Sequence, residues 1–163
     1  VGDVGDVFAG ETKKVVTRVK VRAGRGAAVE VANVDVRYTD VPDARPAHTP
    51  AAALALVTTD PAAVKASVDR TAAAAAQRAW GSTYLDRSTR AYEKGDAAQA
   101  RTIAEQGAAL LRQAAIDFDI PELEADAQIV EINAAPMRSV PSTSEEGRIQ
   151  TKKNKELYRD LYR

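Results

Sequence analysis

The spacing of apolar residues changes at Asp60, and this change constrains the fold more than any other feature of the sequence. Before Asp60, apolar residues alternate with polar ones, as in a half-buried strand. After Asp60 they recur at the spacing of a helix packed along one face. The sequence therefore predicts an α+β fold: a small antiparallel β-sheet or sandwich piece, then an α-helical hairpin with additional C-terminal helices.

Residues 1–60 are expected to form a β-strand subdomain of three strands. Residues 15–22 alternate with a period of two, and AGRG at 23–26 supplies a turn. A third strand is expected over 52–59, after the loop DVPDARPAHTP. Three strands make a sheet of marginal size, so the helices or a missing upstream segment should complete it.

The second expected strand, residues 28–38, contains a change of phase. Its apolar residues stand at odd positions up to Val31 and at even positions from Val34 onward. One extra residue near Ala32 and Asn33 would bring both sets onto one face. The pattern therefore predicts a β-bulge there.

Residues 61–134 are expected to be helical. Asp60 suits the N-cap, and Pro61 suits the first helical position, where its missing N–H costs nothing. The first helix is expected to reach Lys94, either unbroken or interrupted at Gly81.

A second helix should follow directly, and the two should form an antiparallel hairpin. Gly95 suits the left-handed residue after a helix, and Asp96 suits the next N-cap. Residues 103–118 keep helical apolar spacing, and a third helix is expected over 121–133. The apolar contributors of this third helix are Leu123, Ile129, Val130 and Ile132.

Residues 135–147 predict a linker, and residues 148–163 predict a basic amphipathic helix. The linker sequence APMRSVPSTSEEG combines prolines with serines and a threonine. In the tail, Lys and Arg outnumber Glu156 and Asp160 by four. Its narrow apolar stripe consists of Leu157, Tyr158, Leu161 and Tyr162.

This tail is the candidate partner-binding surface. A basic amphipathic helix can dock a protein partner or lie near an acidic surface. The alternative, which we favour, is that the stripe folds back onto the sheet or the helical hairpin, because exposed apolar patches are uncommon. The candidate partner-binding residues are Lys152, Lys153, Leu157, Tyr158, Arg159, Leu161 and Tyr162.

Other polar and aromatic residues are less suited to form a metal, catalytic or ligand-binding site. Asp3, Asp6 and Glu11 could share a hard cation, but a calcium loop concentrates more acidic ligands, so a turn into the first strand is expected. His48 has no second histidine with which to form a metal pair or a relay, so it is expected at the surface. The aromatics at helical spacing, Trp80, Tyr84 and Tyr92, predict packing rather than a ligand groove.

The composition excludes several classes of protein. The chain has no cysteine, no glycine-rich phosphate loop, no serine elbow and no paired-histidine helix, so no catalytic residue, metal or cofactor is expected and the protein is not expected to be an enzyme. Lys plus Arg and Asp plus Glu are 23 each, which gives no overall attraction to nucleic acid. The longest apolar run, 51–57, is far shorter than the roughly 20 residues that span a bilayer.

The N-terminus predicts a fragment. The sequence begins at Val1 and shows no basic segment followed by an apolar one, so no signal peptide is visible and an upstream part is expected to be missing. The sequence does not assign the oligomeric state, and a cytoplasmic location is expected.

The first line of the sequence resembles a known family. VGDVFAGETKKVVTRVKVRAG, followed by a strand ending VDVRYTD, is similar to the segment directly after the von Willebrand factor type A domain in bacterial proteins of the inter-alpha-trypsin heavy-chain-like group. The matching pattern is Gly5, Asp6, Val7, Phe8, Ala9, Gly10 and Glu11.

This resemblance implies a β-sandwich piece packed beside the A domain, followed by a helical extension, and it implies no catalysis. Metal-dependent ligand binding in that family belongs to the Asp-x-Ser-x-Ser loop of the A domain, and this chain has no such loop. The expected function is a non-catalytic scaffold and protein-interaction module of a von Willebrand factor A-type protein. Its expected partner is another protein or the upstream A domain of the same polypeptide.

The helical hairpin looks like the middle of a tetratricopeptide repeat, with Ala100 and Ala104 at the small crossing positions and Tyr92 and Gly95 at the turn. It departs from that repeat because no Leu-Gly pair precedes the turn and no second copy follows. The alternative function is therefore a free-standing helical adaptor that binds a protein partner through its hairpin groove or its basic tail.

Overall fold

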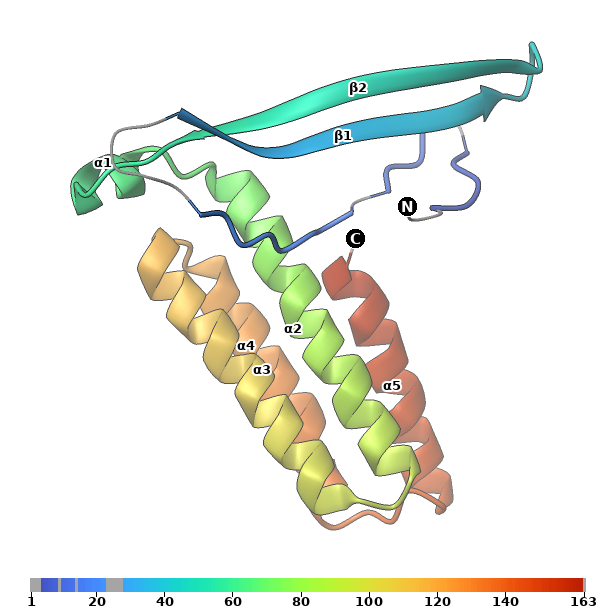
Figure 1. Cartoon of the computed structure of the whole chain (residues 1–163). Coiled ribbons are helices and arrows are strands. Elements are labelled where there is room, and N and C mark those ends of the chain that lie inside the picture. Colours follow the sequence, from blue (N-terminus) through green and yellow to red (C-terminus); the bar gives the residue numbers. More distant parts are fainter. Residues whose placement is uncertain (1–3, 9, 14, 23–27, 163) are drawn as a thin grey trace. The chain divides into compact units, whose positions relative to one another are not determined.

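The computed structural model describes residues 4–8, 10–13, 15–22 and 28–162, without the side chain of Tyr162. Contacts divide the chain into two units, residues 17–67 and residues 68–163 with 1–16, and each is described by itself. A two-stranded sheet precedes the helices, which confirms the α+β class (Figure 1). The elements are β1 (Ala28–Asp40), β2 (Arg45–Leu56), α1 (Pro61–Ala66), α2 (Arg70–Glu93), α3 (Ala97–Phe118), α4 (Glu122–Ala134), the 3-10 helix η1 (Ala135–Arg138) and α5 (Glu145–Tyr162).

Strands β1 and β2 form one long antiparallel hairpin (Figure 1). The ladder runs from the Ala28–Leu56 pair to the Asp40–Arg45 pair at the turn. Its register shifts between Glu30 and Ala32, which confirms the predicted bulge.

Of the strands predicted on either side of β1, the one over residues 15–22 is not formed in the described chain, and the one over 52–59 is formed only to Leu56 and begins earlier, at Arg45. Residues 15–22 pair with no strand in the described chain, because alternation makes a segment suitable for a strand but only a partner makes it one. The proline-rich segment expected to be a loop instead supplies much of β2, since prolines are tolerated on an edge strand. The turn predicted at 23–26 lies outside the described residues.

The predicted helix start at Asp60 is confirmed, but the helix is short. The Asp60 carboxylate accepts a hydrogen bond from the Ala62 N–H at 2.9 Å. Helix α1 ends before Ser67, and Asp69 caps α2 by accepting from the Ala72 N–H at 3.0 Å. This second N-cap, rather than Gly81, is where the predicted long helix is interrupted.

The second unit is a bundle in which α2 packs against α3 on one side and α5 on the other, while α4 covers α3 (Figure 1). The turn between α2 and α3 forms as predicted: Gly95 has a φ of +86°, and the Asp96 side chain accepts from the Gln99 N–H. The antiparallel helical hairpin is therefore confirmed. The core is small-residue rich, with Ala100, Ala104, Ala108 and Ala127 fully buried.

Not every expected apolar contact of α4 is made. Leu123 and Val130 are fully buried, whereas Ile129 is 41% and Ile132 is 70% exposed. The amphipathic stripe of α4 is thus narrower than its apolar composition predicts, and two isoleucines lie on its open face.

Helices α2 and α3 approach each other closely at two glycines. A Cβ added at Gly107 would lie 2.7 Å from the Tyr84 Cβ, and one added at Gly81 would lie 3.0 Å from a Leu111 methyl group. Here glycine is required for space between helices, since both residues lie within regular helix. Nearer the turn between these helices, Tyr92 is 1% exposed and packs with Ala100, Ile103 and Met137.

Polar groups inside the bundle are largely paired with backbone carbonyls. The Ser88 hydroxyl donates to the Ala100 carbonyl at 2.6 Å across the α2–α3 contact, and the Tyr92 hydroxyl donates to the Val140 carbonyl at 2.6 Å. The Tyr92 bond holds the 135–147 segment, which also contains η1 and the fully buried Met137. Burial raises the pKa of Tyr92, which further favours the protonated hydroxyl that donates this bond.

A guanidinium joins α3 to α4. Arg112 donates to both carboxylate oxygens of Glu131 at 2.5 and 2.6 Å, and to Glu124 at 3.1 Å. Hydrogen bonding by Arg112 holds the pKa of Glu131 below its usual range, and the two glutamates raise the pKa of Arg112.

Gly107→Ala should destabilise the bundle even though alanine favours helices. The new Cβ meets the Tyr84 Cβ, which is fixed by its backbone, so α2 and α3 must move apart. We expect a loss of about 1–3 kcal/mol in unfolding free energy by chemical denaturation. Gln106→Ala, on the exposed face of α3, should change stability little, and equal stability of both variants would contradict the close approach.

Glu131→Gln should lower stability at pH 7 and lose its effect in acid. Because the folded pKa of Glu131 is depressed, its contribution is present above the unfolded value of 4.5 and disappears as pH falls through the folded pKa. The pair is part-exposed, so we expect at most about 1 kcal/mol at pH 7. Urea unfolding at pH 7 and pH 3 measures this, with Glu105→Gln, paired only within α3, as the control. A difference that persists at pH 3 would exclude the ionic origin.

Candidate interaction surfaces

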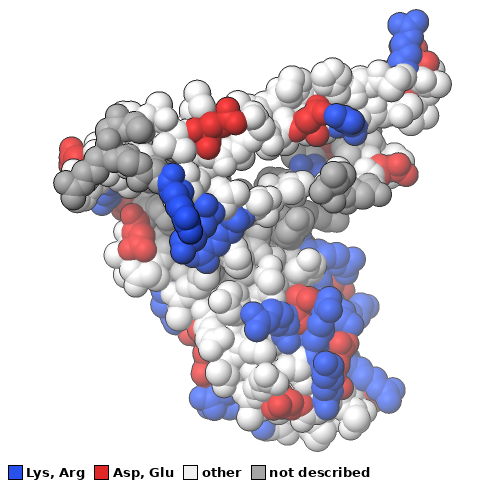
Figure 2. All heavy atoms as spheres, viewed as in Figure 1, with Lys and Arg blue, Asp and Glu red and all other residues white. Residues whose placement is uncertain are grey.

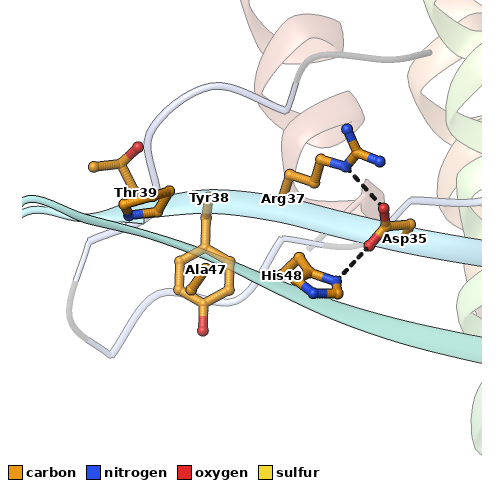
Figure 3. Close-up of a pocket in the computed structure, with 7 residues that line it drawn as sticks. Asp35, Arg37, Tyr38, Thr39, Ala47 and His48 are labelled. Carbon is orange, nitrogen blue, oxygen red and sulfur yellow. Dashed lines mark hydrogen bonds and ion pairs between the residues drawn. The ribbon is translucent and has the colours of Figure 1, made fainter.

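The hairpin carries an exposed cluster of charged side chains on one face (Figure 3). Asp35 accepts from Arg37 Nε at 2.8 Å, and its other carboxylate oxygen lies 3.3 Å from His48 Nδ1 on β2. The hydrogen bond from Arg37 is the main cause that lowers the pKa of the Asp35 carboxyl. The pairing register produces this cluster, since Arg37 and His48 stand directly opposite each other.

His48 is a surface residue, as expected. Its side chain is 68% exposed and that of Asp35 is 39% exposed, so water screens the contact between them. A histidine that acts as a general base is held by its partner against a reacting group. This pair is better suited to fixing the hairpin register than to proton transfer.

The opposite face of the hairpin carries an apolar stripe. Val34, Val36 and Tyr38 follow one another on β1 and are 50%, 47% and 52% exposed. Figure 3 shows Tyr38 extending to the side opposite Thr39 and Arg37. A hollow of about 580 Å³ at this end of the hairpin is lined mainly by residues of the charged face, together with Tyr38 and Ala47. We name Val34, Val36 and Tyr38 the β1 stripe.

The structure separates the predicted partner-binding tail into two groups. Its apolar members pack inward: Leu161 is 6% exposed and belongs to the bundle core, and Leu157 and Tyr158 pack against that core. Its basic members, Lys152, Lys153 and Arg159, are exposed. The side chain of Tyr162 lies outside the described residues.

Helix α5 is fixed in the bundle by its polar residues as well. Gln150 donates to the Asn133 carbonyl at 2.6 Å and to Asn154 Oδ1 at 3.0 Å, and Asn154 is fully buried. Lys155 pairs with Glu93 of α2 at 2.6 Å. Figure 2 shows Lys and Arg side chains gathered over the part of the bundle that α5 occupies, with acidic side chains between them. The outer face of α5 is therefore mixed in charge.

The N-terminal aspartates do not gather as cation ligands in the described chain. Gly5 and Gly10 turn the backbone with φ of +63° and +80°, and the Glu11 carboxylate accepts from the Phe8 N–H at 2.9 Å. The Lys13 ammonium donates to the carbonyls of Val4 and Asp6, where a cation would need free oxygens. Asp3 lies outside the described residues, and no three His, Asp or Glu residues cluster within them.

A groove lies between α2, α4 and α5. Its volume is about 1180 Å³, and its alanine floor on α2 faces Ile129 of α4 and Leu157 of α5. Two ion pairs cross its end: Arg70 with Asp119 at 2.8 Å and Arg78 with Asp126 at 2.7 Å. The groove is wide and its charges are largely paired.

Sequence reasoning missed the Asp35–Arg37–His48 cluster. His48 lies in a segment predicted to be a loop, so no register could be assigned to bring it to Asp35. The sequence feature that could have indicated a strand here is the spacing of Pro46 and Pro50. Residues four apart have the same orientation in a strand, so both prolines can lie with their nitrogens toward the open side of an edge strand.

Comparison with protein-family models, with curated proteins and with solved structures found no significant match. No described helix is both long and apolar enough to cross a membrane.

Leu161→Ala should destabilise the bundle, because Leu161 fills the core between α5 and its neighbours. We expect a loss of about 2 kcal/mol, measured by thermal and chemical unfolding. Lys153→Ala, on the exposed face of the same helix, should leave stability unchanged within about 0.5 kcal/mol. An unchanged melting temperature for Leu161→Ala would show that α5 does not depend on this contact.

Proposed function

We propose that this chain is a non-catalytic scaffold and protein-interaction module whose main contact surface is the β1–β2 hairpin. One observation carries the proposal: the β1 stripe is about half exposed on a sheet that has only two strands in the described chain. A two-stranded sheet is marginally stable in water, and a third strand or a covering surface stabilises it. An exposed apolar stripe on such a sheet is typical of a surface that another protein covers.

We further propose that the module belongs to a von Willebrand factor A-type protein. The resemblance of residues 1–60 to the segment after an A domain supports this assignment, and so does the local geometry. The turns at Gly5 and Gly10 and the Phe8–Glu11 bonds fit a junction between two folded parts. Val7 and Phe8, expected to anchor this junction, are 54% and 73% exposed, so they are available to a neighbouring domain.

A helical adaptor is the second candidate function. The full burial of Ala100 and Ala104 at the α2–α3 crossing matches the tetratricopeptide-like packing, and the groove between α2, α4 and α5 is wide enough for a peptide. The inward packing of Leu157 and Leu161 argues against the tail as an apolar docking site, since those side chains already fill the bundle. The groove is therefore the better binding surface for this alternative.

The test of the proposed function begins with the polypeptide that the gene encodes before Val1. An Asp-x-Ser-x-Ser loop there identifies an A domain, and its absence would overturn the A-type assignment. The A domain, expressed separately, should copurify with this chain. Val34→Glu, which places a charge on the β1 stripe, should reduce capture at least tenfold, because burying an unpaired carboxylate is costly.

Two controls separate the candidate surfaces. Thr39→Glu adds the same charge on the opposite face of β1 and should leave capture of the A domain unchanged. Ala75→Arg fills the alanine floor of the groove and should also leave capture unchanged. Loss of capture by Ala75→Arg but not by Val34→Glu would favour the helical adaptor instead.

A further inference from the structure

The two outer edges of the hairpin differ in their ability to accept another strand. Pro46 and Pro50 lie opposite Thr39 and Asp35 in the ladder. A proline nitrogen has no hydrogen to donate, so these residues fit only non-hydrogen-bonded pairs, where the nitrogen faces away from the partner strand. The outer edge of β2 therefore lacks N–H donors at both prolines, which blocks regular pairing there.

The outer edge of β1 has no such block. Because Asp35 and Thr39 are in non-hydrogen-bonded pairs, the outward backbone groups of β1 belong to the alternate residues Asn33, Asp35, Arg37 and Thr39. None of these is a proline, and no other described strand pairs with them. This edge therefore presents an unbroken row of donors and acceptors.

We propose that a second copy of this chain occupies the β1 edge, with β1 pairing antiparallel to β1 about a twofold axis through Val36. This inference rests on the proposed function of the hairpin as a contact surface and names its partner. Asp35 then faces Arg37 of the second copy, and Asn33 faces Thr39 of the second copy. The backbone groups of all four residues point outward, so the two pairs are hydrogen-bonded across the new ladder.

The side chains fit the same register. On one face, Val36 lies opposite Val36 of the second copy, and Val34 lies opposite Tyr38 of the second copy. The two β1 stripes thus become one continuous apolar surface of aliphatic and aromatic pairs. On the other face, each Asp35 meets the Arg37 of the second copy, so its carboxylate gains a second guanidinium beside the one at 2.8 Å in its own chain.

The charged residues of β1 favour the axis at Val36 over an axis one residue away in either direction. Moving the twofold axis to Asp35 places two carboxylates opposite each other, and moving it to Arg37 places two guanidinium groups opposite each other, which destabilises the pair. Slipping one strand by one residue puts the apolar stripe on the face of the charged cluster and breaks the phase of the outward backbone groups. Of these registers, the axis at Val36 alone satisfies the backbone, the charges and the apolar stripe together.

A cysteine at the axis tests the pairing directly. The chain contains no cysteine, so Val36→Cys can form a disulfide only between copies. Opposed residues in a non-hydrogen-bonded pair have Cα atoms about 4.5 Å apart, within the range of a disulfide. Thr49→Cys is the matched control, since it faces Val36 on β2 and would lie three strand spacings, about 14 Å, from its copy.

We expect mild oxidation to give a covalent dimer of Val36→Cys and a monomer of Thr49→Cys on a non-reducing gel. Light scattering of the unmodified chain should show a mass that rises from monomer to dimer with concentration. Equal cross-linking of both cysteine variants would indicate contact between faces and would overturn the edge pairing. Circular dichroism confirms that each variant keeps its helical unit.

Charge reversal gives a second test that does not depend on a cysteine. Asp35→Arg and Arg37→Asp each place like charges opposite one another at two symmetric positions, which should weaken the dimer about tenfold. Mixing the two variants pairs an all-positive strand with an all-negative one, so a heterodimer should form with at least the affinity of the unmodified chain. Failure of the mixture to associate would overturn the proposed register.

The outcomes also separate this inference from the proposed function. If the unmodified chain stays monomeric at all concentrations while Val34→Glu still reduces capture of the A domain at least tenfold, the second copy is excluded and the interaction module stands. If the chain dimerises through β1 but captures no A domain, self-association through the hairpin stands and the A-type assignment falls.

Discussion

The helical unit depends on how closely α2 and α3 approach each other. Many of its core residues are alanines, which bury little surface each, so the unit is stable only if the helix backbones are near enough for many short contacts. Gly81 and Gly107 make this approach possible by leaving out the Cβ atoms that would separate the helices. Once α2 and α3 are fixed, α4 and α5 have grooves in which Val130 and Leu161 are buried.

The hairpin follows the opposite principle. Its two strands hydrogen-bond to each other along one edge of each strand. In the part of the chain that the structure describes, no further strand pairs with either outer edge, and most side chains on both faces are exposed. The helical unit buries most of its apolar stripe against its own helices, whereas the hairpin leaves apolar side chains and backbone hydrogen-bonding groups exposed. This contrast supports the assignment of interaction to the hairpin and of structural support to the bundle.

Local chemistry made some elements predictable from sequence. The caps at Asp60 and Asp96 and the turn at Gly95 involve only neighbouring residues, so the sequence predicts them correctly. The bulge near Ala32 was also predictable, because the change of apolar phase lies within one strand.

Features that depend on partners far along the chain were not predictable. Residues 15–22 have the alternation of a strand but pair with no strand among the described residues, and β2 includes prolines that only its edge position permits. The Arg112–Glu131 bonds and the Asp35–His48 contact join residues that only the fold brings together. In the tail, Leu157, Tyr158 and Leu161 of the predicted apolar stripe pack against the bundle core, whereas the basic residues Lys152, Lys153 and Arg159 are exposed.

Pro46 and Pro50 also bear on the size of any assembly. A sheet open at both edges can add strands without end, which is the route to fibres. A sheet closed on one side by prolines can be extended only from the other, and when the extending strand is its own copy, the closed sides end up outermost. Two residues without an N–H would thus set a finite stoichiometry, protecting the chain from aggregation while it keeps one edge for recognition.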